Sequence, residues 1–124
     1  PELADVLNRV RQPFNVSSVA QAAALAALAD EEHLQQSVRI NHDGMQQLTQ
    51  GLQALGLEFI ASVGNFVAVD VGGDSGAVYE KLLREGVITR PVDNYGMPGF
   101  LRISIGLPQE NQRCLTALDR VLGP

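Results

Sequence analysis

The sequence has little lysine, a single cysteine and no long apolar run. Eight of its nine basic residues are arginines, and Lys81 is the only lysine. Cys114 has no second cysteine to pair with, and with only His33 and His42 beside it the chain lacks the ligand spacing of a zinc site. No run approaches the roughly 20 apolar residues of a membrane helix, and no basic start precedes an apolar segment as in a signal peptide. These absences predict a cytoplasmic protein without a metal site or a membrane partner.

The composition is that of a globular chain with an acidic balance. Of the 124 residues 45% are hydrophobic, and 14 acidic against 9 basic side chains leave a formal charge of -5. This content argues against disorder, and the length suits one domain. Proteins that bind a phosphate backbone concentrate Lys and Arg, so the charge disfavours a nucleic-acid partner.

Helical patterns fill the first part of the chain. Pro1 is a favourable first helical residue, and the apolar spacing continues until Gln12-Pro13. Ser18, followed three residues later by Gln21, predicts a capping box that opens a second helix, composed almost wholly of Ala and Leu. Such a helix has no polar face and must be buried or packed against a partner surface. Because no methionine precedes Pro1, we expect processing or excision from a longer polypeptide.

The third predicted helix is long and contains two glycines. It starts near residue 30 and ends before Gly56, which suits a left-handed C′ position. Gly44 and Gly51 each cost about 1 kcal/mol relative to Ala within a helix. Tertiary packing must therefore hold this helix together.

From residue 58 onward the pattern alternates between strands and helices. Strands are predicted at 58–61, 66–71, 87–90 and 100–105, and helices at 75–85 and from Pro108 onward. The resulting order is β-β-α-β-β-α. We expect a single α+β domain over 1–124, with a small antiparallel or mixed sheet of about four strands and helices packed on one face.

The usual catalytic motifs are missing. The loop Gly72-Gly73-Asp74-Ser75-Gly76 matches neither a dinucleotide-binding fingerprint nor a P-loop, and it is typical of a turn with a helix cap. No serine has the surroundings of a nucleophile elbow. Lys81 falls on the polar face of a predicted surface helix, which favours a solvated amine over a Schiff base. We therefore predict no catalytic residue within this chain.

Arg102 stands out within the last predicted strand. Leu101, Ile103 and Ile105 alternate toward one face, which leaves Arg102 on the opposite face. One interpretation is a solvated sheet face. The other is a guanidinium held on a rigid strand, where its planar fork binds a carboxylate through two hydrogen bonds. Arg90 on the neighbouring strand would then be a second anion contact.

Three segments near the C-terminus carry a family resemblance. They are Gly86-Val-Ile-Thr-Arg90-Pro91, Tyr95-Gly96-Met97-Pro98 and Leu101-Arg102-Ile-Ser-Ile-Gly106. Together with the segments 10–16 and 64–67 they resemble the C-terminal part of histidinol-phosphate aminotransferases, which are pyridoxal-phosphate enzymes of fold type I. The resemblance runs over the whole chain, although the strand that contains Arg102 also resembles related aminotransferases.

The resemblance implies roles for four residues. The arginine corresponding to Arg102 binds the substrate carboxylate, and Arg90 is expected near the substrate phosphate. Asn15 and Tyr95 match positions close to the substrate cleft. The implied substrates are histidinol phosphate and the glutamate/2-oxoglutarate pair of histidine biosynthesis.

The resemblance also implies what this segment lacks. The cofactor-binding large domain, with its Schiff-base lysine, would precede this segment, and the full-length enzyme would be a homodimer that holds pyridoxal 5'-phosphate. The segment alone would then hold no cofactor and be inactive. Three alternatives are another class I/II aminotransferase acting on aromatic or other amino acids, a free-standing anion-binding or regulatory α+β module, and a structural or dimerisation domain.

Overall fold

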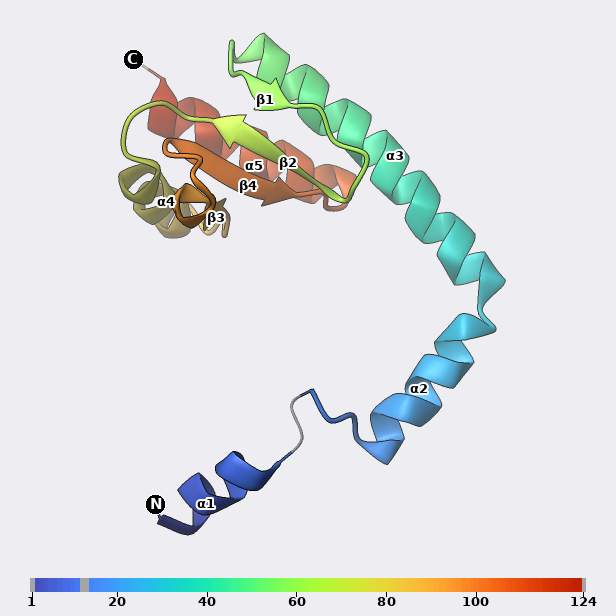
Figure 1. Ribbon diagram of the computed structural model, residues 1–124. Helices are drawn as coiled ribbons and strands as arrows, with labels where there is room; N and C mark the ends of the chain where they lie inside the picture. The colour runs from blue at the N-terminus through green and yellow to red at the C-terminus, as the bar shows by residue number, and fades with distance from the viewer. Residues whose placement is uncertain (1, 12–13, 124) are drawn as a thin grey trace. The chain divides into compact units, whose positions relative to one another are not determined.

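The chain forms two compact units, Pro1–Gln35 and Gln36–Pro124. The computed structural model describes residues 2–11 and 14–123 (Figure 1). The first unit contains helix α1 (Glu2–Val10), helix α2 (Ser18–Leu28) and the start of helix α3 (Glu31–Ala54). The predicted helix start at Pro1 and the break at Gln12-Pro13 lie outside the described residues.

Helix α2 begins with a cap one residue earlier than the sequence pattern predicts. Ser17 has extended backbone angles, and its hydroxyl accepts a hydrogen bond from the Ala20 amide at 3.2 Å. The Gln21 side chain donates to the Val16 carbonyl at 3.1 Å. The prediction of a capping box at Ser18 was therefore wrong, because Ser18 already belongs to the helix and only Ser17 can direct its oxygen at the free amides.

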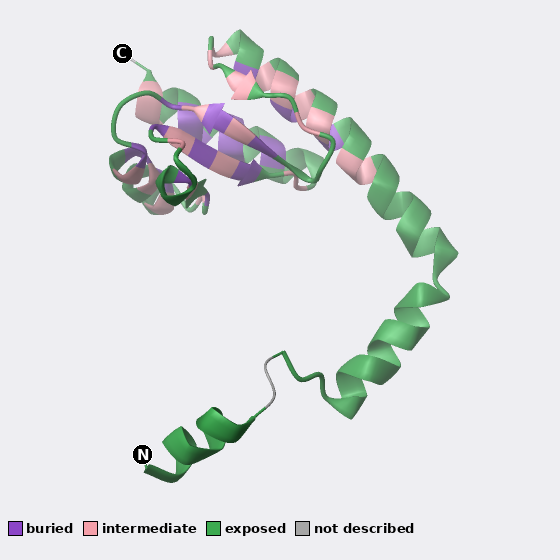
Figure 2. Ribbon diagram, in the orientation of Figure 1, coloured by how far each residue is buried: buried purple, intermediate pink, exposed green. Residues whose placement is uncertain are grey.

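The apolar side chains of α2 are exposed. None of its residues is buried, and Val19, Leu25 and Leu28 are among the exposed large hydrophobic side chains (Figure 2). Within the described residues nothing buries this helix, so its packing against a partner surface stays a prediction. No helix in the described part of the chain is long and apolar enough to cross a membrane.

The second unit is built on an antiparallel sheet with the order β1-β2-β4-β3. Its strands are β1 (Phe59–Ile60), β2 (Phe66–Asp70), β3 (Arg90–Pro91) and β4 (Phe100–Ser104). Helix α4 (Ser75–Arg84), the short 3-10 helix η1 (Asp93–Tyr95) and helix α5 (Pro108–Leu122) complete the unit. The predicted α+β fold and the element order are confirmed.

One strand differs from its prediction. Residues 87–89 are not paired in the sheet, and β3 starts only at Arg90. Gly86 has a left-handed backbone (φ 74°), and the Val87 amide donates to the Leu82 carbonyl at 2.9 Å. The predicted strand 87–90 was wrong because the first residues after α4 close that helix instead of pairing with β4.

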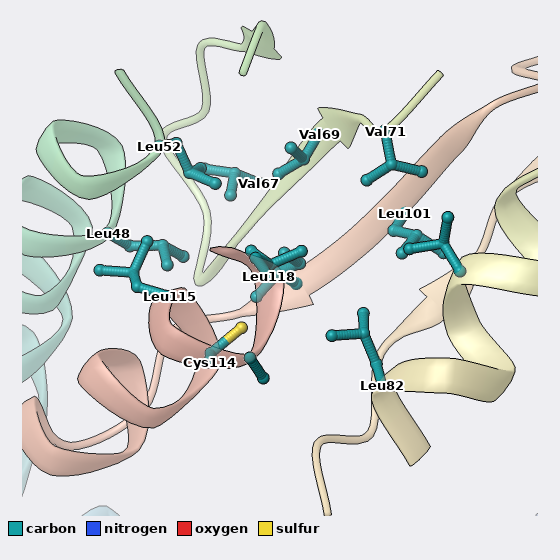
Figure 3. Packing of buried hydrophobic residues seen from close by; sticks show 13 residues of the cluster. Leu48, Leu52, Val67, Val69, Val71, Leu82, Leu101, Cys114, Leu115 and Leu118 are labelled. Atoms are coloured by element: carbon teal, nitrogen blue, oxygen red, sulfur yellow. The ribbon is translucent and has the colours of Figure 1, made fainter. Parts of the chain in front are cut away.

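The hydrophobic core lies on one face of the sheet. Alternate residues of the two central strands point into it, and three helices cover them. Figure 3 shows side chains from α3, α5 and the sheet directed at one another. The core is formed by Leu48, Leu52, Val67, Val69, Val71, Val78, Leu82, Leu101, Ile103, Cys114, Leu115, Ala117 and Leu118. All three helices occupy this side, so none of them covers the opposite face of the sheet.

The glycines of α3 allow a close helix approach. A Cβ placed on Gly44 would lie 2.6 Å from Cγ2 of Ile105 and 3.2 Å from the Gly106 carbonyl oxygen. A Cβ on Gly51 would collide with the Leu115 side chain. The helix-propensity cost of these glycines is thus offset by packing that no larger residue permits.

Candidate functional site

Arg102 lies in the centre of β4, on the sheet face that the helices leave free. Its neighbours Leu101 and Ile103 are buried in the core, whereas Arg102 is half-buried. This alternation is visible along β4 in Figure 2. The predicted placement of Arg102 opposite Leu101 and Ile103 is therefore confirmed, and its strand holds it on a rigid element.

Arg90 lies directly opposite Arg102 in the β3–β4 ladder. Directly opposed residues of antiparallel strands share one face, and two like charges in that arrangement destabilise the sheet. Among the described residues the salt bridges are Arg9–Asp5 and Arg120–Glu85, so neither Arg90 nor Arg102 is paired with a carboxylate there. An uncompensated pair of guanidinium groups on one face is an arrangement suited to binding an anion.

Asp70 lies on the same sheet face as the two arginines. Asp70 pairs with Phe100 in the β2–β4 ladder, which places it diagonal to Arg102. Its carboxylate accepts a hydrogen bond from the Gly72 amide at 2.9 Å. Asp70 thus shapes the turn after β2, and among the described residues it forms no salt bridge with Arg102.

Tyr95 contacts Arg90. Nη2 of Arg90 donates to the Tyr95 hydroxyl at 3.3 Å, and the guanidinium carbon lies 5.8 Å from the ring centroid. The structure therefore brings Arg90, Arg102 and Tyr95 together at one edge of the sheet. Asn15 lies in the first unit, where it is exposed in the link before α2, so the geometry of this cluster concerns the other three residues.

A buried serine anchors the loop that carries Tyr95. The Ser75 hydroxyl, at the start of α4, donates to the Asp93 carboxylate at 2.6 Å. This hydrogen bond lowers the pKa of Asp93 below its usual range. Because the folded-state pKa is depressed, the contribution to stability is present above the unfolded-state pKa and is lost as the pH falls through the folded-state pKa.

Replacing Ser75 by alanine tests this anchor. We expect the pKa of Asp93 to rise toward the ordinary value of an aspartate, because the hydroxyl that stabilises the ionised carboxylate is gone. Carbon-detected NMR titration of the Asp93 carboxyl in the wild type and in Ser75→Ala measures the change. Ser62→Ala, on the turn before β2, is the control, and an unchanged Asp93 pKa in Ser75→Ala would contradict the assignment.

Phe66 was missed by the sequence analysis. The guanidinium carbon of Arg102 lies 5.0 Å from the centroid of the Phe66 ring. The motif Gly64-Asn65-Phe66-Val67 contributed to the family resemblance, but it gave Phe66 no role. Only the register of β2 against β4 reveals the contact, since 36 positions separate the two residues in the chain.

The remaining candidates for chemistry stand apart from this cluster. Lys81 is exposed on α4, as predicted, and His33 and His42 are exposed on α3. Burial raises the pKa of the Cys114 thiol to about 11, so it stays protonated near neutral pH and is a poor nucleophile. Within the residues that the structure describes, no three His, Cys, Asp or Glu side chains lie close enough to hold a metal ion.

A crevice of about 470 Å³ opens on another part of the second unit. It runs between residues 86–89, the end of β4 and the start of α5, and its lining includes Thr89, Asn111 and Cys114. Neither Arg90 nor Arg102 borders it. The arginine pair, which lies on an open sheet face, is therefore the better candidate for a functional site.

The chain is similar to known aminotransferases. The family model "Aminotransferase class I and II" matches residues 1–118. Histidinol-phosphate aminotransferase 2 of Pseudomonas aeruginosa is 65% identical over 120 residues, covering 97% of this chain and 32% of the relative. The protein of the same name from Pseudomonas fluorescens (strain Pf0-1) is 62% identical over 122 residues, covering 98% and 33%. This chain thus spans about a third of the length of the curated relatives that it matches.

A solved structure supports the same comparison. The histidinol-phosphate aminotransferase from Sinorhizobium meliloti, in complex with pyridoxal-5'-phosphate, matches with a TM-score of 0.74 and 30% identity. The match covers 98% of this chain and 34% of that protein. The similarity therefore extends over the fold and is not confined to short motifs.

Proposed function

The chain belongs to the class I and II aminotransferases, and from that premise we propose that the protein containing it transfers an amino group between histidinol phosphate and 2-oxoglutarate. Relatives at 62–65% identity that are named histidinol-phosphate aminotransferases support this substrate pair. The observation that carries the proposal is the directly opposed pair Arg90 and Arg102, which has no carboxylate partner in the described part of the chain.

The two arginines have distinct roles in this proposal. Arg102 binds the α-carboxylate of glutamate and 2-oxoglutarate, because a guanidinium fork matches a carboxylate with two parallel hydrogen bonds. Histidinol phosphate has no carboxylate, so its phosphate takes the same cationic region, with Arg90 and Tyr95 beside it. Anions of both shapes fit, because a pair of guanidinium groups supplies charge and several donors. Asn15 is assigned a role in substrate binding on the family resemblance alone.

Pyridoxal 5'-phosphate is the cofactor that the family implies, and the residues of this chain do not fit it. A Schiff-base lysine is activated by desolvation or by a neighbouring cation. Lys81 is the only lysine, and it is exposed on the solvent side of α4. We therefore assign the cofactor site to the part of the longer protein outside this chain, and we expect residues 1–124 alone to be inactive.

The assembly belongs to the same proposal. Residues 1–124 form the C-terminal domain of a cytoplasmic homodimeric enzyme. The exposed apolar side chains of α2 support a contact with the rest of the longer protein or with its partner subunit.

A comparison of amino donors tests the function. The full-length protein is assayed with 2-oxoglutarate as acceptor and with histidinol phosphate or phenylalanine as donor. We expect a higher kcat/KM for histidinol phosphate, because phenylalanine carries no phosphate for Arg90. A preference for phenylalanine would instead support an aromatic aminotransferase. Residues 1–124 alone serve as the control and should show no amino transfer.

A further inference from the structure

The Phe66 ring forms a platform for the guanidinium group of Arg102. Phe66 pairs with Ser104, and Arg102 pairs with Ala68, so Phe66 is a diagonal neighbour of Arg102 on the same sheet face. Aromatic side chains reach across such a diagonal. The distance of 5.0 Å from the guanidinium carbon to the ring centroid lies within the range of a cation–π contact.

Among the described neighbours of Arg102, the Phe66 ring is the group that can orient the guanidinium. Ala68, directly opposite, is too short to hold it, and Asp70 forms no salt bridge with it among the described residues. Nε of Arg102 is buried and has no hydrogen-bond partner within the described residues. An anion that arrives from solvent therefore meets the terminal nitrogens Nη1 and Nη2.

We propose that Phe66 is a positioning residue that holds Arg102 so that its two terminal nitrogens bind the substrate anion end-on. The proposal rests on the assignment of Arg102 as the carboxylate-binding residue. An aromatic face suits this task because it attracts the cation without using any N–H donor. A carboxylate at the same place would hold the arginine equally well, but it would compete with the substrate for those donors.

The test compares Phe66 variants of the full-length holoenzyme. Phe66→Leu removes the aromatic face and keeps apolar bulk, Phe66→Met is a second variant of this kind, and Phe66→Tyr keeps the face. Phe100→Leu is the matched control, because Phe100 lies on the same sheet face in β4. Calorimetry measures the binding of maleate, an unreactive dicarboxylate, and of inorganic phosphate, while thermal unfolding confirms that each variant is folded.

The expected change in affinity is modest and specific. For a half-exposed cation–π contact we expect Phe66→Leu and Phe66→Met to weaken binding of both anions about three- to five-fold. Phe66→Tyr and Phe100→Leu should stay within about twofold of the wild type. KM for 2-oxoglutarate should rise by the same factor as the dissociation constant, with kcat unchanged, because the contact acts on binding.

A double-mutant cycle separates positioning from general structure. In an Arg102→Ala background Phe66→Leu should have no further effect on maleate binding, since the group that it positions is gone. An equal loss in both backgrounds, or wild-type affinity in Phe66→Leu and Phe66→Met, would overturn the role of Phe66. If Arg102→Ala itself keeps wild-type affinity, it is the assignment of Arg102 that fails.

Discussion

Replacing Arg102 by alanine in the full-length aminotransferase is expected to weaken the binding of 2-oxoglutarate about 100-fold. The variant loses two hydrogen bonds to a charged group, each worth roughly 1.5–3 kcal/mol, and Arg90 offsets part of that loss. Each 1.4 kcal/mol corresponds to a factor of about ten in affinity. Calorimetric titration of the wild type and Arg102→Ala measures the difference.

Two further variants show whether the affinity for 2-oxoglutarate depends on the fork geometry of Arg102 or on its charge alone. Arg102→Lys keeps the positive charge and loses the planar pair of donors, so an intermediate loss of about tenfold is expected. Arg84→Ala removes an exposed arginine of α4 that lies outside the cluster, and it should leave the affinity unchanged. An affinity of Arg102→Ala within twofold of the wild type would rule out Arg102 as the carboxylate ligand.

Replacing Asn111 by alanine is expected to lower the free energy of unfolding of this chain by about 3 kcal/mol. Asn111 is 2% exposed, and its side chain satisfies both backbone groups of Gly106. Its Oδ1 accepts from the Gly106 amide at 2.9 Å, and its Nδ2 donates to the Gly106 carbonyl at 3.0 Å. Truncation leaves the amide and the carbonyl of half-buried Gly106 without these two partners. Urea unfolding of residues 1–124 measures the effect.

Gln47 provides the matched comparison. Its Oε1 accepts a hydrogen bond from Asn111 Nδ2 at 3.2 Å, and its Nε2 donates to the Pro108 carbonyl at 3.0 Å. Gln47 is only half-buried, so water replaces much of what Gln47→Ala removes, and a loss of about 1 kcal/mol is expected. If the two variants were equally stable, Asn111 would contribute no more than an ordinary surface contact.

Local sequence signals predicted the helix ends that are capped by residues within the helix or next to it. Asp74 accepts a hydrogen bond from the Ala77 amide and begins α4, and Pro108 stands at the first position of α5. Gly56 and Gly86 both adopt left-handed angles just after a helix. These features depend on neighbours within a few positions, which the sequence displays directly.

The site was visible from the sequence only in part. The alternation of Leu101 and Ile103 placed Arg102 on the free face, and the strand pattern suggested Arg90 as a second anion contact. The family resemblance added Tyr95 and Asn15. The sequence did not show that Arg90 lies opposite Arg102, or that Phe66 covers the guanidinium group. Both facts depend on strand register, which joins residues far apart in the chain.

The amino-acid sequence by itself determined the order of helices and strands, the face on which Arg102 lies and the family to which the chain belongs. Caps, periodicity and residue spacing are local properties, so each can be read from a few neighbouring residues. The tertiary structure alone decided that residues 87–89 leave the sheet, that Gly44 and Gly51 admit a close helix contact, and that Asn111 satisfies Gly106. These outcomes depend on which distant atoms meet in a close-packed interior, where a single added Cβ or one unsatisfied amide changes the free energy of folding.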